Sequence, residues 1–409
     1  MIPTLDPDPA VPQRDLLLDP ELVAARLAHA LGAVVEDCLQ TRVKYRVGAR
    51  LRVVHRVRAR GATFDVAAST FPTLERSVRA LAKASERAVA CGPVPPVALD
   101  RELTTIFWTY PNDRKLEHLA ALSKPAPELA ELLPAWSRST LVAYAPEKNA
   151  TVRCLDTAER TVAFAKTYSG DEGERTARLH DRLLHELGAD DHHLRVPRAL
   201  AYSSERRTLI VEAVESRPLA TPESYWRLGR ALARLHDLSP PGDMRFRRVE
   251  PDKLAAAAGL IGLVREDVAE TARELADELC SRLDRQAQAV CLHGDVNFRN
   301  ALLDNGRIAL IDLDQAAAGP AAAELGSVLA SLRYAGIVGL IRPELVPELG
   351  AALLAGYRDL RRPPKDDQLR AHTAAALLAE RCLRVVTRVR PEGLRRLPAL
   401  LAEAQEVLA

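Results

Sequence analysis

The chain has 409 residues, of which 47% are hydrophobic and 27% are charged, a composition typical of a globular protein with more than one domain. Lys and Arg number 57 against 55 Asp and Glu, so the net charge of +2 gives no reason to expect a nucleic-acid or membrane partner. The six cysteines form no C-x-x-C pair and no apolar run is long enough to span a bilayer, so we expect no structural zinc, disulfide or membrane segment. The N-terminus lacks a signal-sequence pattern, and we expect a cytoplasmic protein.

The first third of the sequence predicts a short helix followed by a β-rich unit. Apolar residues recur at helical spacing from Glu21 to Leu31, and the segment from Arg42 to Phe71 has the pattern of a hairpin or three-stranded meander. A helix is expected from Glu75 to Ala90, and a strand from Leu103 to Thr109.

The same order of elements recurs about a hundred residues later, beginning near Leu141. In this alignment Tyr45 corresponds to Tyr144, and Ser69 corresponds to Lys166. One explanation is that β-rich segments of similar composition align by chance. The other is that a β-rich lobe has been duplicated, and that the first copy has since degenerated.

The remaining sequence predicts a linker and then a helical region. Residues 117–133 are helix-forming and interrupted by prolines, and long amphipathic helices dominate after Pro218. We therefore expect an α+β protein of three parts. Residues 1–134 would form a cap domain, residues 135–218 the β-rich N-lobe, and residues 219–409 a helical C-lobe.

A short segment in the helical region carries the residue types of phosphoryl-transfer chemistry. It reads C-L-H-G-D-V-N-F-R-N-A-L-L-D-N-G-R-I-A-L-I-D-L-D. An Asn-Gly pair predicts a tight hairpin turn, and this hairpin would bring Asn300 and Asp312 together near one metal ion. Asp295 lies five residues before Asn300, the spacing of base and metal ligand in kinase-type catalytic loops. The alternative is a hairpin with solvated acidic ends.

The pattern H-G-D-x-x-x-x-N followed by I-D-x-D resembles the signature of the aminoglycoside phosphotransferase and choline kinase superfamily, over roughly residues 139–360. The resemblance implies a protein-kinase-like bilobal fold that uses ATP and Mg²⁺. It implies that Asp295 is the catalytic base and that His293 braces the loop. It also implies that Asn300 and Asp312 bind Mg²⁺, with Asp314 as a further carboxylate at the metal site.

The second copy offers a phosphate-binding lysine, Lys166, at the end of an apolar strand. An edge-strand lysine that prevents aggregation is the alternative. Because the first copy has Ser69 at this position, we expect only the second copy to bind ATP. The strand from Thr208 to Ala213 resembles the hinge of the family, where the backbone of Glu212 and Val214 would meet adenine.

Two features of this resemblance are left open by the sequence. The helix glutamate that pairs with the lysine could be Glu174 or Glu186. Downstream, G-P-A-A-A-E-L-G has Glu324 where the family has Asp, so it is unsettled whether the longer acid makes the same loop contact.

The expected function is transfer of the ATP γ-phosphoryl group to a hydroxyl of a small polar acceptor, such as a sugar or sugar-containing metabolite. The alternatives are a kinase of Ser or Thr in a small peptide, and an inactive nucleotide-binding or scaffolding protein. Six arginines and one acid lie between Arg381 and Arg396. If these arginines line the acceptor site, they disfavour polycationic aminoglycosides; a solvated helix face is the alternative.

Overall fold

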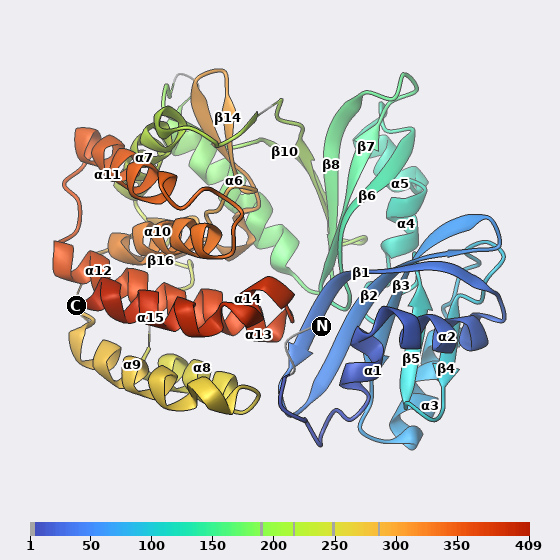
Figure 1. The fold of residues 1–409 in the computed structure, drawn as a ribbon. Coiled ribbons are helices and arrows are strands. Elements are labelled where there is room, and N and C mark those ends of the chain that lie inside the picture. The colour runs from blue at the N-terminus through green and yellow to red at the C-terminus, as the bar shows by residue number, and fades with distance from the viewer. Residues whose placement is uncertain (1–4, 189–190, 216, 248–249, 285–286) are drawn as a thin grey trace.

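A computed structural model describes residues 5–188, 191–215, 217–247, 250–284 and 287–409. It contains two sheet domains and a helical part that lies beside both of them (Figure 1). The predicted α+β class is confirmed: a β-rich lobe and a helical lobe are preceded by an additional β-sheet domain. In this described part of the chain no helix is long and apolar enough to cross a membrane, and the cysteines form no disulfide bond.

The first sheet has five strands in the order β1-β2-β3-β5-β4. Turns at Gly48 and Gly61, both with positive φ, connect β1 to β2 and β2 to β3. Along β1, Val43 and Tyr45 are buried, whereas the residues between and beside them point away from this core. The elements of this domain are α1 (Arg14–Leu18), α2 (Pro20–Leu31), β1 (Val35–Arg46), β2 (Arg50–Ala59), β3 (Ala62–Thr70), α3 (Leu74–Ser85), β4 (Val97–Asp100) and β5 (Thr105–Thr109).

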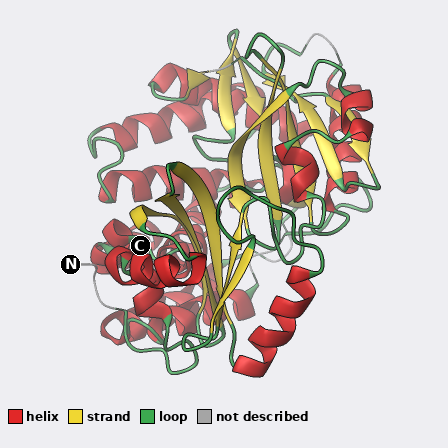
Figure 2. Ribbon diagram, turned by 90° about the vertical axis from the view of Figure 1, so that its right-hand side faces the viewer, coloured by secondary structure: helices red, strands yellow, loops and turns green. Residues whose placement is uncertain are grey.

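The second sheet repeats this strand order as β6-β7-β8-β11-β10. Figure 2 shows the two sheets as separate groups of strands, each accompanied by helices. The elements of this lobe are β6 (Arg138–Ala145), β7 (Asn149–Leu155), β8 (Thr161–Tyr168), α6 (Glu172–Leu187), β9 (Leu194–Arg195), β10 (Ala199–Ser203) and β11 (Thr208–Glu212).

The strand pairing of the two sheets is equivalent as well as their order. Ser69 in β3 pairs with Arg52 in β2, and Lys166 in β8 pairs with Thr151 in β7 at the corresponding step of the ladder. The two sheets therefore place Ser69 and Lys166 at equivalent positions, as the sequence alignment predicted. A common strand order together with a common register supports duplication over chance alignment.

The segment between the two sheets contains two short helices, α4 (Leu119–Ser123) and α5 (Pro127–Leu132). Leu122 and Leu129 are fully buried in the same cluster as Val152 and Ile210 of the second sheet. This linker thus packs onto the second sheet, and the division of the chain at residue 134 stays a prediction.

The helical part and the first sheet domain share one apolar core. Leu27 and Tyr45 of the first domain belong to the same buried cluster as Ile261, Leu279 and Leu400 of the helices. The elements of this part are β12 (Arg217–Pro218), α7 (Pro222–Asp237), α8 (Pro251–Gly262), η1 (Glu266–Val268), α9 (Ala269–Arg282), β13 (Ala289–Leu292), β14 (Ala301–Asp304), β15 (Arg307–Leu310), η2 (Leu313–Gln315), β16 (Ala317–Pro320), α10 (Ala321–Ile337), α11 (Leu345–Leu360), α12 (Asp366–Ala376), the π-helix η3 (Leu377–Cys382), α13 (Leu383–Thr387), α14 (Pro391–Arg395) and α15 (Leu397–Leu408).

Helices α7 and α11 pack closely because glycines face each other at their contact. A Cβ at Gly356 would lie 1.9 Å from the Trp226 carbonyl oxygen. We therefore expect Gly356→Ala to lower the free energy of unfolding by about 1–3 kcal/mol through overpacking. Thermal unfolding would show this as a lower Tm.

The matched control is Gly259→Ala in α8, where a Cβ would meet no atom within 4 Å. That change should raise stability by about 0.5–1 kcal/mol, because alanine is the better helix former. Equal Tm values for the two variants would contradict the close packing of α7 and α11.

Candidate active site

The predicted hairpin forms around the Asn-Gly turn. Asp304 pairs with Arg307, and both Asn305 and Gly306 have the positive φ that a two-residue hairpin turn of this type requires. The preceding strand β13 ends at Leu292, and the loop that follows carries His293, Asp295 and Asn300. Sequence spacing alone was sufficient to locate these elements.

The buried carboxylate of Glu324 holds this catalytic loop. Glu324 lies in the first turn of α10, where its carboxylate accepts hydrogen bonds from the backbone N–H groups of His293, at 3.1 Å, and Gly294, at 2.7 Å. The His236 ring lies 3.1 Å from the same carboxylate. Burial acts to raise the pKa of Glu324, but the hydrogen bond from His236 and the loop N–H groups outweigh it and the pKa is lowered. Glu324, which stands where the family has an aspartate, therefore does contact the loop.

Gly294 is required at this point of the loop. Its φ is 81°, and a Cβ would lie 2.1 Å from the Gln315 carbonyl oxygen. The His293 ring braces the loop from the other side, because Nε2 lies 2.8 Å from the Ile311 carbonyl oxygen and Nδ1 is 3.3 Å from the Asp295 N–H. The catalytic loop is thus tied to the end of β15.

Asp295 and Asn300 meet within the loop. The Asn300 side-chain N–H group donates to the Asp295 backbone carbonyl at 3.0 Å, and the Asp295 side chain is 28% exposed. An accessible carboxylate on a braced loop can accept a proton from a bound hydroxyl. The amide oxygen of Asn300 is the atom of that side chain which suits a hard cation.

Lys166 from the second sheet meets two carboxylates from the helical part. Its Nζ lies 2.7 Å from Asp312 and 2.7 Å from Asp314. The Tyr168 hydroxyl donates to Asp314 at 2.8 Å and Thr176 contacts the same carboxylate, so Asp314 is held by three groups. Burial would lower the pKa of Lys166, but the two carboxylates raise it overall. Lys166 is therefore charged at neutral pH.

Asp312 has the backbone conformation expected of a functional residue. It is a non-glycine residue with φ 64° and ψ 60°, a region that costs energy for most side chains. Burial acts to raise its pKa, yet Lys166 lowers it overall, so the carboxylate is ionised at neutral pH.

The oxygens of Asp312 and Asn300 fit a magnesium site. In the described ranges no group of three or more His, Cys, Asp or Glu side chains is arranged to hold a metal ion. Mg²⁺ in phosphotransferases needs only one or two protein carboxylates, since phosphate oxygens and water complete its shell. The donor set is therefore adequate for Mg²⁺ bound together with a nucleotide.

Neither candidate helix glutamate pairs with Lys166. Glu174 lies against Arg178 on the exposed side of α6, and Glu186, which is half-buried, lies against Arg182. Helix α6 instead presents Thr176 to Asp314. The sequence could not distinguish these outcomes, because they depend on the rotation of α6 about its own axis.

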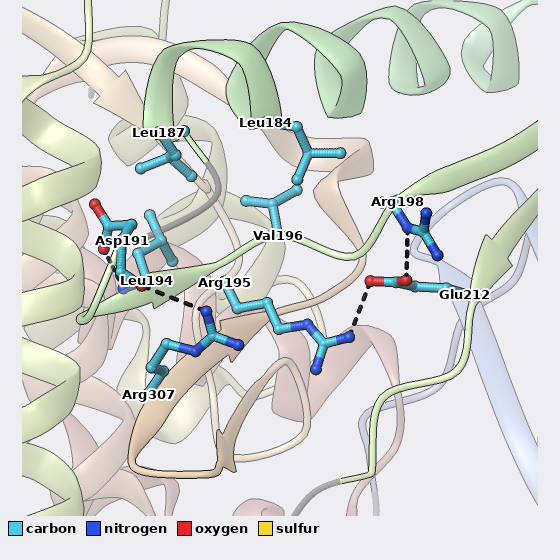
Figure 3. Close-up of a pocket in the computed structure, with 10 residues that line it drawn as sticks. Leu184, Leu187, Asp191, Leu194, Arg195, Val196, Arg198, Glu212 and Arg307 are labelled. Carbon is cyan, nitrogen blue, oxygen red and sulfur yellow. Dashed lines mark hydrogen bonds and ion pairs between the residues drawn. The ribbon is translucent and has the colours of Figure 1, made fainter.

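The side chain of Glu212, in the expected hinge, pairs with two arginines and not with Lys166. Glu212 pairs with Arg195 at 3.0 Å and Arg198 at 3.0 Å, and it lines a pocket of about 380 Å³ with residues of α6, β9 and β15 (Figure 3). No other predicted site residue lines this pocket. Glu212 and Val214 therefore remain candidates for backbone contacts alone, and Val214 is half-buried after the end of β11.

The turn between β6 and β7 is held by the first domain. Glu147 at its tip is buried and pairs with Arg52 at 2.8 Å, Arg114 at 2.7 Å and Arg50 at 3.4 Å. By its resemblance to the kinase fold, this turn at residues 146–149 would correspond to the flap that covers the nucleotide phosphates. The sequence did not predict these ion pairs. Glu147 and Gly48 of the first sheet domain occupy equivalent turn positions, and both have a positive φ.

Arginines near the C-terminus reach the catalytic loop. Two guanidinium nitrogens of Arg384 each lie 3.4 Å from the Asp295 carboxylate, and Arg381 donates to Ser327. Arg381 lies in the π-helix η3 and Arg384 lies just after it in α13. The π-helix changes the helical register before α13 begins. In contrast, Arg395 pairs with Glu392 and Arg396 is exposed.

The fold and the site define a small-molecule phosphotransferase. Family comparison agrees with this class, because the model of the phosphotransferase enzyme family (APH) matches residues 142–371. The match covers more than half of the chain, and the chain belongs to this family. A comparison with curated proteins found no match.

Solved structures of similar shape include other small-molecule kinases. A spectinomycin phosphotransferase matches with 15% identity and a TM-score of 0.47, over 70% of this chain and 98% of its own. An amicoumacin kinase matches with 15% identity and a TM-score of 0.49, over 70% of this chain and 91% of its own. A choline/ethanolamine kinase family protein from Mesorhizobium loti matches with 14% identity and a TM-score of 0.46, over 71% of this chain and 92% of its own.

The Glu324 network generates the first prediction about the site. Glu324→Gln removes the charge and leaves one carbonyl oxygen for the two loop N–H groups. We expect the free energy of unfolding to fall by about 3–5 kcal/mol, as for a broken buried pair, with a matching loss of activity. Because the pKa of Glu324 is lowered on folding, the difference from wild type should be complete above the ordinary glutamate pKa and shrink as the pH falls below it.

Chemical denaturation between pH 7 and pH 3 measures this difference. Glu344→Gln is the control, since Glu344 is exposed and should show no effect at any pH. A Glu324→Gln protein as stable as wild type at pH 7 would show that the loop does not depend on this carboxylate.

Proposed function

We propose that the protein transfers the γ-phosphoryl group of ATP to a hydroxyl of a small polar acceptor, with Mg²⁺ as the metal. The observation that carries this proposal is the meeting of Lys166 with Asp312 and Asp314 beside the loop of Asp295 and Asn300. These are the cation, the metal ligands and the base that phosphoryl transfer requires.

Each residue has a defined part in the proposed reaction. Lys166 would move from the carboxylates to the phosphates of ATP, and Asp312 with Asn300 would hold Mg²⁺. Bound Mg²⁺ would neutralise phosphate charge. Asp295 would orient the acceptor hydroxyl and receive its proton as the new P–O bond forms and the bond from the γ-phosphorus to the bridging oxygen breaks. ADP is the leaving group.

The other expected functions are less well supported. An inactive scaffold has no need for an accessible Asp295, or for a largely buried lysine, Lys166, that is held between two carboxylates. A peptide acceptor carrying Ser or Thr would use the same chemistry, and acceptor assays decide between the two. We propose a sugar or sugar-containing metabolite as the acceptor and the cytoplasm as the compartment.

Asp295→Asn should abolish transfer and leave nucleotide binding nearly intact, because Asp295 acts on the hydroxyl and not on ATP. We expect kcat to fall by at least a hundredfold, equivalent to about 2.7 kcal/mol of transition-state stabilisation. Steady-state ADP release with a panel of sugars and aminocyclitols, together with nucleotide titration, measures both quantities. Retention of more than about a tenth of wild-type kcat would remove Asp295 from the role of base.

The chain should bind one nucleotide. The first sheet has Ser69 at the lysine position and no catalytic loop of its own follows it in the chain before the second sheet. Calorimetric titration with a Mg²⁺ complex of a non-hydrolysable ATP analogue should give a stoichiometry near one. Lys166→Met should weaken this binding at least tenfold, whereas Ser69→Ala should have no effect. Two equivalent sites would refute the assignment of the first domain as a non-catalytic cap.

A further inference from the structure

Cations crowd around one side of Asp295, and they come from two distant parts of the chain. Arg384 and Arg388 lie one turn apart on α13, and Arg384 contacts Asp295. Arg388 donates to the Val43 carbonyl oxygen at 3.2 Å, which docks α13 against β1 of the first domain. The N-terminal domain therefore reaches the surroundings of the catalytic base.

Strand β1 adds two cations at this contact. Val43 and Tyr45 point into the apolar core, so Arg42 and Lys44 lie on the opposite face of the strand. Lys44 is directly opposite Arg52 in the β1–β2 ladder. Like charges at directly opposed positions destabilise a sheet, and a purely structural surface would not favour them.

These cations lack acidic partners. Arg52 is compensated by Glu147, and Arg384 by Asp295. In the described part of the chain no carboxylate forms an ion pair with Arg42, Lys44 or Arg388. These three cations therefore lie at the contact of α13 with β1 without an acidic partner, next to Arg384, whose charge interacts with Asp295 and Glu380.

The proximity of these groups affects their ionisation. Partial burial, together with Arg52, Arg388 and Lys148, lowers the pKa of Lys44 to about 8. Burial, together with Arg42 and Arg384, lowers the pKa of Arg388 to about 10. An anion bound among them would relieve this repulsion and stabilise the charged forms.

We propose that Arg42, Lys44, Arg384 and Arg388 form an anion subsite of the acceptor site, and that the acceptor carries a phosphate or carboxylate group in addition to its hydroxyl. Arginine is suited to such groups because its planar guanidinium can donate two parallel hydrogen bonds to one oxyanion. The subsite adjoins Asp295, whereas Lys166 provides the cation for the nucleotide. The inference rests on the proposed function for the identity of Asp295 as the base.

Binding of inorganic sulfate tests the subsite without any need for turnover. The protein is first saturated with the Mg²⁺ complex of a non-hydrolysable ATP analogue, which occupies the nucleotide phosphate site, and sulfate is then titrated calorimetrically. We expect Arg42→Gln and Arg388→Gln each to weaken sulfate binding at least fivefold. Arg396→Gln is the matched control and should bind sulfate as wild type does, because Arg396 is exposed and distant from Asp295 in the chain.

A separate variant shows whether a loss of sulfate binding comes from a loss of folding. Lys44→Gln removes one of two directly opposed cations, so its Tm in sulfate-free buffer should equal or exceed that of wild type while its sulfate affinity falls. Equal sulfate affinity in wild type, Arg42→Gln and Lys44→Gln would overturn the subsite. If the cations instead bind the nucleotide, the variants would weaken binding of the ATP analogue and leave the sulfate affinity unchanged. That result would also overturn the subsite.

Matched acceptor pairs test the substrate class. Glucose is compared with glucose 6-phosphate and glucuronate, and myo-inositol with inositol 1-phosphate. We expect higher kcat/KM for the anionic member of each pair that is turned over, and we expect Arg388→Gln to reduce this preference at least tenfold. Preference for the neutral members would overturn the inference and leave the proposed function standing. Sulfate binding that depends on the arginines, without transfer to any acceptor even under saturating ATP and Mg²⁺, would support the subsite and count against the proposed function.

Discussion

The arrangement of the site depends on one buried carboxylate. Glu324 is fully enclosed, and it is the shared acceptor for two backbone N–H groups of the catalytic loop and for the His236 ring. A buried charge is stable only if such partners replace the water it has lost, so the loop and the carboxylate are mutually dependent. Through His293 the same loop is tied to the strand end that carries Asp312. One anion at the start of α10 thus holds the loop that carries the proposed base and the proposed metal ligand Asn300.

The second organising feature is the contact of the first domain with both lobes. It holds the β6–β7 turn through Glu147 and shares its apolar core with the C-terminal helices. The first sheet has Ser69 where the second sheet has Lys166, and the first domain holds a turn of the second sheet. Its strand β1 also contacts α13, the helix that carries Arg384 to Asp295.

The catalytic motif could be predicted from the sequence because it is local. Asp295 and Asn300 lie on one loop, and the Asn-Gly turn determines how Asp312 returns to them. Lys166 could be singled out from the sequence because it is a lone cation at the end of an apolar strand, and the equivalent position of the first sheet carries Ser69. The α+β class and the change to helices followed from periodicity in the same way.

The partners of these residues could not be predicted in this way. The carboxylates beside Lys166 are Asp312 and Asp314 and not a helix glutamate, because α6 turns Glu174 toward Arg178 and Glu186 toward Arg182. The contact of Arg384 with Asp295 depends on a π-helix, whose extra residue per turn no periodicity in the sequence reveals. Glu147 is paired with arginines far away in the chain. In each case the outcome is decided by three-dimensional packing between elements and not by local spacing.

The three parts of the molecule form a closed ring. The second sheet joins the helical part through the hinge after β11, the helical part joins the first sheet through a common core, and the first sheet joins the second through Glu147. Arg195 forms a further link within this ring. It pairs with Glu212 of β11 at 3.0 Å and with Asp304 of the β14–β15 hairpin at 2.6 Å. Two rigid bodies on one hinge can swing apart freely, but three bodies joined in a ring can open only if one joint yields. The first and second sheets also share an apolar cluster, because Val54 and Ala67 are buried together with Tyr144 and Ala150. Both joints of the first domain therefore contain buried apolar surface, and opening either one would expose that surface to water.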